Sequence, residues 1–172
     1  DNILTPNKVT GFDSQIIQIT TGYNHTVAIT THGTLFAWGM NRYGQLGNGS
    51  IQHQRRPTKI TGFDSPVTHV TARSDHTLAL TKKKSLYTWG FNYNGQIGNG
   101  TVGHQVIPSK IMDFDSRVTS INSGDAHIIA LTENGSVYAW GYNTIGQVGN
   151  NTQDDQFTPT KITGFDSPVT RV

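Results

Sequence analysis

The 172-residue sequence has no cysteine, little charge and no long apolar run. Without thiols there is no disulfide and no cysteine nucleophile, a composition that fits any redox compartment. Thirteen Lys and Arg residues against eleven Asp and Glu give a formal net charge of +2, spread thinly. Nucleic-acid-binding proteins usually concentrate positive charge on one face, so nucleic acid is not expected as a partner. No apolar run approaches the roughly 20 residues of a membrane helix, and no signal peptide is visible.

Repetition dominates what is present. Trp38, Trp89 and Trp140 stand 51 residues apart, and a glycine-rich stretch at 37–49 returns at 88–100 and 139–151. Such a fixed period predicts a repeat architecture. The last 19 residues resemble the first 19, and the sequence does not begin with Met, so we expect a piece of a longer polypeptide.

Each repeat contains four short stretches typical of β-strands and no helical periodicity. In the first repeat they are 16–20, 26–30, 34–38 and the residues around 59–60. Pro57 precedes the fourth stretch and suits an outer strand, where a missing N–H costs least. Four antiparallel strands per repeat predict an all-β fold made of β-propeller blades. A kelch-type propeller has a similar period, but the Gly-Gly doublet expected in each repeat is absent.

The glycine-rich stretch that recurs after each Trp is readily explained by structure alone. The large Trp ring can fill the wedge between adjacent blades. Gly39 permits a backbone turn that a side chain would obstruct. In the stretch 44–47, Gly44 and Gly47 can take positive φ while Gln45 bonds the backbone of its own loop. We therefore predict a packing role for these residues.

The repeated motifs resemble those of the regulator of chromosome condensation repeat family over the whole sequence. The motifs are Gly-x-x-His-Thr at 22–26, an aliphatic strand, a stretch ending in Trp-Gly at 33–39 and a stretch ending in Gly-Gln-Leu-Gly at 41–47. Each has counterparts in the later repeats. The resemblance implies a propeller of usually seven blades. It divides the chain into the outer strand of a preceding blade (1–15), repeats at 16–66, 67–117 and 118–168, and the start of a further blade (169–172). Further blades, or a second copy of the chain as a homo-oligomer, would close the ring.

The same resemblance implies two functions. The founding member is a nucleotide-exchange factor for the small GTPase Ran and docks on nucleosomes, whereas many other members use the propeller as an interaction module. We expect a module that binds a protein partner through its loop face, with exchange on a Ran-type GTPase as the alternative. No covalent catalytic constellation, cofactor or metal site is expected, since the repeat histidines lie one per blade, too far apart for zinc ligands at about 2.0–2.1 Å. An intracellular location is favoured over secretion.

In the exchange factor, one face is lined by the repeat His and by an Asp one or two residues before it. The candidate partner-binding residues carried over by this match are His25, His76, His127, Asp75 and Asp125. Carboxylates there could engage basic residues of a GTPase. Alternatively, these side chains tie their loop to neighbouring backbone amides. The segment between Trp and Gly-Gln has the same length in all three repeats, so no extended wedge for nucleotide displacement is evident.

The second repeat departs from the others in charge. Arg73 stands where the other repeats have Gly22 and Gly124, and Lys84 stands where they have Gly33 and Gly135. With Lys82 and Lys83, these residues predict a basic spot that faces a partner, such as an acidic protein or lipid headgroups. The alternative is a solvated hairpin turn, because three lysines are few for strong polyanion binding at physiological salt.

Overall fold

A computed structural model of the chain describes residues 5–172, which form three sheets of four antiparallel strands and no helix. Blade 1 contains β1 (Ile16–Thr21), β2 (His25–Thr30), β3 (Leu35–Gly39) and β4 (Gln54–Ile60). Blade 2 contains β5 (Val67–Arg73), β6 (His76–Thr81), β7 (Leu86–Gly90) and β8 (Gln105–Ile111). Blade 3 contains β9 (Val118–Ser123), β10 (His127–Thr132), β11 (Val137–Gly141) and β12 (Gln156–Ile162).

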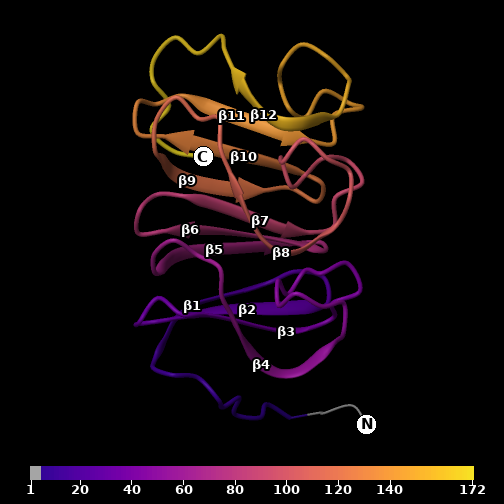
Figure 1. Cartoon of the computed structure of the whole chain (residues 1–172). Helices are drawn as coiled ribbons and strands as arrows, with labels where there is room; N and C mark the ends of the chain where they lie inside the picture. Colours follow the sequence, from indigo (N-terminus) through magenta and orange to yellow (C-terminus); the bar gives the residue numbers. More distant parts are fainter. Residues whose placement is uncertain (1–4) are drawn as a thin grey trace.

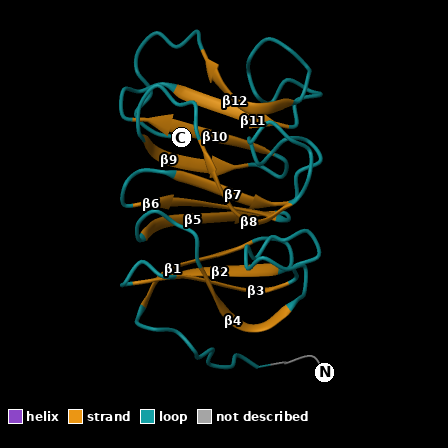
Figure 2. Cartoon of the chain, viewed as in Figure 1, coloured by secondary structure: helices purple, strands orange, loops and turns teal. Residues whose placement is uncertain are grey.

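The predicted all-β fold is confirmed. Within each blade, consecutive strands pair as neighbours, and the three sheets stack in chain order (Figures 1 and 2). The inner strands β1, β5 and β9 together line a polar groove of about 330 Å³. With no helix in residues 5–172, none is available that is long and apolar enough to cross a membrane.

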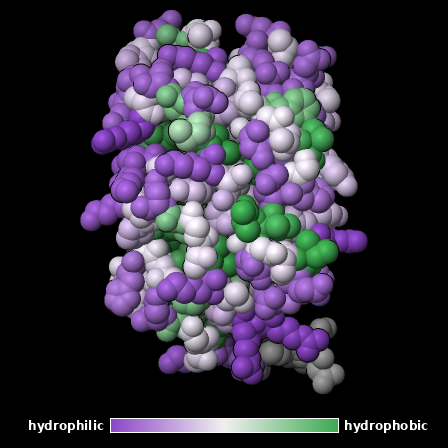
Figure 3. Space-filling model, in the orientation of Figure 1, coloured by the Kyte–Doolittle hydropathy of each residue, from purple (hydrophilic) through white to green (hydrophobic). Residues whose placement is uncertain are grey.

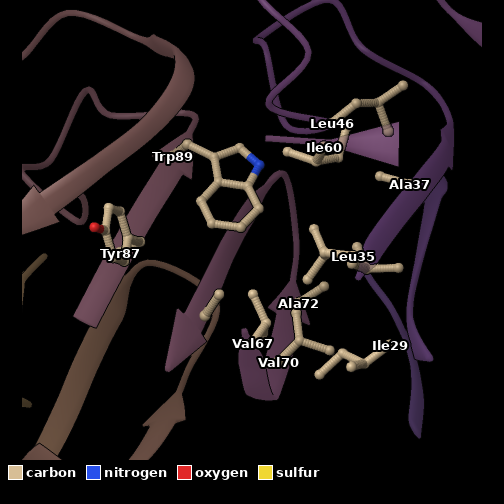
Figure 4. Close-up of a cluster of buried hydrophobic side chains, with 12 residues drawn as sticks. Ile29, Leu35, Ala37, Leu46, Ile60, Val67, Val70, Ala72, Tyr87 and Trp89 are labelled. Carbon is tan, nitrogen blue, oxygen red and sulfur yellow. The ribbon is translucent and has the colours of Figure 1, made fainter. Parts of the chain in front are cut away.

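The core lies between the blades rather than within them. All six residues of β6 are buried, because one of its faces packs on blade 1 and the other on blade 3. Trp89 projects from blade 2 towards Leu46 and Ile60 of blade 1 (Figure 4). Trp140 is equally inaccessible at the next joint. The predicted Trp wedge is confirmed for Trp89 and Trp140, whereas Trp38 fills no joint between two described blades.

The glycine-rich loops also behave as predicted. Gly39 has φ +105°, and a Cβ on it would lie 2.5 Å from the Asn24 carbonyl oxygen. A Cβ on Gly47, at φ +78°, would lie 2.6 Å from the Trp89 ring nitrogen. Gln45 accepts a hydrogen bond from the Tyr43 backbone N–H at 3.0 Å. These glycines therefore allow the loop to close over the Trp of the next blade.

The register gives each blade two distinct ends. His25 pairs with Gly39, which in turn pairs with Gln54, so the β1–β2 and β3–β4 connections emerge together. We call this end, in all three blades, the loop face: residues 22–24, 40–53, 74–75, 91–104, 124–126 and 142–155. The opposite end is the turn face: residues 31–34, 61–66, 82–85, 112–117, 133–136 and 163–168. Figure 1 shows the glycine-rich loops on the right and the short turns on the left.

The flanking segments contain no strand where the structure describes them, at residues 5–15 and 163–172. Residues 1–4 of the predicted outer strand lie outside the described residues. Pairing of either segment with a further blade stays a prediction.

Candidate functional site

The repeat histidines lie beneath the loop face. His25 is 2% exposed and His76 is fully inaccessible, while His127 is half-buried. Burial lowers the pKa of His25 to about 4 and that of His76 to about 3, so both are neutral at physiological pH. Neutral, buried rings hold blades together and do not offer charge to a partner.

His25 makes a specific tie between blades. Its Nε2 lies 2.9 Å from Thr77 Oγ1, and that hydroxyl donates to the Gln45 carbonyl oxygen at 2.8 Å. Since the hydroxyl proton is used, His25 Nε2 is the donor. At the next joint Ile128 occupies the position of Thr77, and both ring nitrogens of His76 lack a hydrogen-bond partner within residues 5–172.

Asp75 and Asp125 have different surroundings. Asp75 is half-buried and accepts a 2.9 Å hydrogen bond from Gln45 Nε2, and burial raises its pKa. Asp125 is 61% exposed in its side chain and lies 2.8 Å from Arg73 Nε. That hydrogen bond lowers the pKa of Asp125. Asp75 thus ties its loop to a side-chain amide of blade 1, not to the neighbouring backbone amides of the alternative, whereas Arg73 and Asp125 form an exposed ion pair across two blades.

Sequence reasoning missed an aromatic cluster on the same face. Tyr43 of blade 1 meets Phe91 and His104 of blade 2, and Tyr93 packs on the same two rings, with ring centroids 4.6–5.1 Å apart. Tyr93 is 65% exposed, and the guanidinium carbon of Arg42 lies 5.5 Å from the Tyr43 ring centroid. The available signal was the concentration of rings at positions where the repeats differ. Figure 3 shows several separate apolar patches among hydrophilic side chains on the face of the molecule in view.

The lysines lie elsewhere. Arg73 pairs with His76 at the loop-face end of blade 2, while Lys82, Lys83 and Lys84 form the turn after Thr81, at the opposite end of β6. The predicted grouping of Arg73 with the lysine run in one basic spot is therefore wrong. Within residues 5–172, no group of three or more His, Asp or Glu side chains is placed to hold a metal ion.

Stacked four-stranded blades, wedged by one Trp each, define a β-propeller repeat protein. A family model described as the regulator of chromosome condensation (RCC1) repeat matches residues 32–80, 85–131 and 134–172. A second model of that description matches 16–45, 67–96 and 118–147. The chain belongs to the regulator of chromosome condensation repeat family.

Curated relatives match along most of the chain. The ultraviolet-B receptor UVR8 of Arabidopsis thaliana is 33% identical over 165 residues, covering 94% of this chain and 38% of the receptor. The mitochondrial RCC1 domain-containing protein RUG3, from the same plant, is 35% identical, covering 92% of the chain and 38% of RUG3. The probable E3 ubiquitin-protein ligase HERC4 of Homo sapiens is 32% identical, covering 87% and 14%. The chain thus spans well under half the length of these relatives.

Two solved structures superpose on most of the chain. Prp20p of Saccharomyces cerevisiae, described with its binding properties to Gsp1p and histones, superposes with a TM-score of 0.80 at 25% identity. The match covers 87% of this chain and 39% of that one. Yeast Prp20 bound to Kap60 superposes with a TM-score of 0.79 at 24% identity, over 87% of this chain and 37% of that one.

Proposed function

We propose that this chain is an interaction module that binds a protein partner through its loop face. The observation that carries the proposal is the partly exposed aromatic cluster of Tyr43, Phe91, Tyr93 and His104. Aromatic and Arg side chains are enriched among the residues that contribute most to protein interfaces. Here they stand on loops held by a rigid β scaffold, which limits the entropy lost on binding.

The charged pair on the same loop face would give the surface specificity. Arg73 and Asp125 are 57% and 61% exposed in their side chains, so a partner can approach both without unfolding a loop. Exposed ion pairs contribute little to stability, about 0–1 kcal/mol. Replacing this ion pair with contacts to charged residues of a partner therefore costs little free energy. Complementary charge between partners increases the association rate and the selectivity.

Alanine variants of the loop face test this proposal. A partner captured by chemical cross-linking and identified by mass spectrometry would be titrated against Tyr93→Ala, Asp125→Ala and the Asp75→Ala, Asp125→Ala double variant. We expect tenfold or greater loss of affinity for Tyr93→Ala and smaller losses for the Asp variants, with little change in melting temperature for Asp125→Ala. Glu133→Ala, on the turn face, is the matched control. Undiminished affinity in all three loop-face variants would contradict the proposal.

A second candidate is nucleotide exchange on a Ran-type small GTPase. Its support is the superposition on Prp20p, described as binding Gsp1p, together with the exposed Asp125 on the loop face. Release of a fluorescent guanine nucleotide from a panel of small GTPases measures it directly. Release rates that stay at the intrinsic value across the panel when the 172-residue chain is added would rule it out.

Association between chains is a further part of the proposal. Trp38 is only half-buried and packs on Phe12, with ring centroids 5.9 Å apart, whereas Trp89 and Trp140 are fully buried. An additional blade, from the same polypeptide or from a second copy, would cover Trp38 in a heterologous contact. Light scattering of the 172-residue chain at micromolar concentration would reveal a dimer, and a concentration-independent monomer would contradict this part.

A further inference from the structure

We propose that the turn face carries a separate binding site, between blades 2 and 3, for a short acidic peptide segment that contains a bulky apolar residue. The site, called here the turn-face groove, is a hollow of about 350 Å³ lined chiefly by Lys83, Lys84, Lys110, Met112, Phe114 and Arg117. It lies at the opposite end of the blades from the loop face.

The corresponding place between blades 1 and 2 is closed by a Gly–Pro contact. A Cβ on Gly33 would lie 2.4 Å from the Pro66 Cβ, so the two residues fill the joint. The Val67 backbone N–H donates to the Gly33 carbonyl oxygen at 2.9 Å and seals it. Gly135 meets Pro168 in the same way, at 2.5 Å. A Gly–Pro contact thus closes this position at both of the other equivalent places in the described chain.

At the joint between blades 2 and 3, both partners of that contact are replaced. Lys84 stands in place of Gly and Arg117 in place of Pro. The backbone bond equivalent to that of Val67 is missing among the described residues. Lys84 keeps the glycine-like φ of +63°, which is unfavourable for a residue with a Cβ. Two coordinated replacements, one of them in a strained conformation, therefore open the groove and make it basic.

The charges of the groove are not balanced by the protein. Lys110 lies 2.8 Å from Asp64, which is outside the lining of the groove. Asp113 is the acidic residue that lines the hollow. Lys83, Lys84 and Arg117 have no acidic partner within 4.0 Å in residues 5–172. Lys82 extends the basic region into the adjoining hollow. An anionic occupant would meet several cations at once.

The floor of the groove selects among anionic ligands. Met112 is 61% exposed, and the half-buried Phe114 lies beside it. Below them, Leu86, Ile111 and Val118 close the bottom. Met adapts its shape to apolar side chains of different form. A few cations around an apolar floor fit carboxylates flanking one hydrophobic residue better than a polyphosphate chain, whose affinity at physiological salt requires many phosphate contacts.

Fluorescence anisotropy tests the site with a labelled twelve-residue peptide of Asp and Glu around one central Phe, at 150 mM salt. Lys84→Gly combined with Arg117→Pro restores the form found at the other joints. We expect this variant to fold and to bind the peptide at least tenfold more weakly. Arg55→Ala combined with Arg56→Ala removes the same charge from exposed positions on β4 and should leave binding unchanged. If the first variant fails to fold, Lys83→Ala with Met112→Ser replaces it, with the same tenfold loss expected.

Other probes decide the chemistry. A peptide with Gly in place of the central Phe should bind at least fivefold more weakly. Equal affinity for the Gly peptide, for phosphatidylserine vesicles or for single-stranded DNA of equal charge would overturn the proposal. So would an unchanged affinity of the groove variants. Tyr93→Ala should retain peptide binding, so the outcome is independent of the loop-face proposal.

Discussion

The joint between blades 1 and 2 and the joint between blades 2 and 3 share the same Trp contact but differ in their other side-chain hydrogen bonds. In both, the indole N–H of a buried Trp donates to the carbonyl oxygen of a loop Gln: Trp89 to Gln45 at 3.0 Å and Trp140 to Gln96 at 3.1 Å. This contact uses the backbone of Gln and so survives changes in its surroundings. It sets the spacing of the blades.

Among the described residues, the side-chain to backbone tie of Gln18 is found at the first joint only. Gln18 donates to the Val70 carbonyl oxygen at 2.7 Å and accepts from its N–H at 3.2 Å. The residues at the same places in the next joint, His69 and Ile121, make no such pair among the described residues. Gln96 Nε2 also lacks a partner within residues 5–172, because Ala126 stands where Gln45 finds Asp75.

The difference indicates that the second joint is the weaker one. Three buried nitrogen atoms at this joint, His76 Nδ1, His76 Nε2 and Gln96 Nε2, lack a hydrogen-bond partner within residues 5–172, against His25 Nδ1 at the first joint. Each such group costs about 1–3 kcal/mol. Of the side-chain ties across this joint, Arg73 with Asp125 is more than half exposed and contributes little, and Asn94 Nδ2 donates to Asp155 Oδ2 at 3.1 Å. The inner strands β5 and β9 also pack less extensively than β1 and β5. Blade 3 should therefore separate before blades 1 and 2 do.

Removing a wedge has the largest expected effect. Trp89→Ala and Trp140→Ala should each lower the free energy of unfolding by about 3–5 kcal/mol, because each deletes a fully buried ring. Trp140→Ala should also increase amide hydrogen exchange in β9–β12 before the rest of the chain. Trp38→Ala, at a half-buried position, is the control with the smaller loss. A loss below about 1 kcal/mol for Trp89→Ala would mean that the joint does not depend on its wedge.

Acid should weaken both joints. His25 and His76 stay neutral when folded, with pKa values near 4 and near 3, but in the unfolded chain each takes up a proton below about pH 6.5. Stability is thus full above pH 6.5 and falls by about 1.4 kcal/mol per pH unit for each ring as the pH drops towards the folded values. Urea unfolding at pH 7 and pH 5.5 should differ by roughly 2–3 kcal/mol.

A variant separates the two joints in that experiment. His76→Leu should lose the share of the pH dependence due to that ring. It should leave the share of His25 and those of His104 and His127, whose pKa values burial also lowers. The aspartates with lowered pKa values, such as Asp115 at about 2, titrate below this window. Equal stability at the two pH values would show that the rings are solvated in the folded state.

The blades could be predicted from the sequence because period, β-branched stretches and Trp-Gly junctions all act locally. The first three predicted strands of each repeat match the observed ones to within two residues, but the fourth, predicted around 59–60, begins at Gln54, so Pro57 lies inside β4 and not before it. The site could not, because its contacts cross the joint with an offset of 52 residues, as in His25–Thr77, Gln18–Val70 and Arg73–Asp125. Aligning the repeats with one another at their period of 51 residues hides that offset. Nor does the linear sequence reveal that the six residues of β6 separate Arg73 from Lys82, so that the two side chains lie at opposite ends of blade 2.

The His25 tie can be removed with little change in shape. Thr77→Val deletes the hydroxyl that His25 contacts, in a residue with no exposed surface. Because a buried ring nitrogen is then left without a partner, the free energy of unfolding should fall by about 1–3 kcal/mol. Thr26→Val, the equivalent position in blade 1 and half-buried, is the matched control. Equal losses for the two variants would contradict the tie.

The reciprocal change should produce the smallest effect. Ile128→Thr places a hydroxyl where Thr77 has one at the first joint, within reach of His76 and of the Gln96 carbonyl oxygen by analogy with His25 and Gln45. Ile29→Thr, in the apolar core between blades 1 and 2, is the control that bears the full loss of apolar burial. The hydrogen bond to His76 should offset about 1–2 kcal/mol of the same loss at Ile128. Denaturant unfolding of both variants measures the difference. If Ile128→Thr loses as much as Ile29→Thr, the missing hydroxyl does not account for the weakness of the second joint.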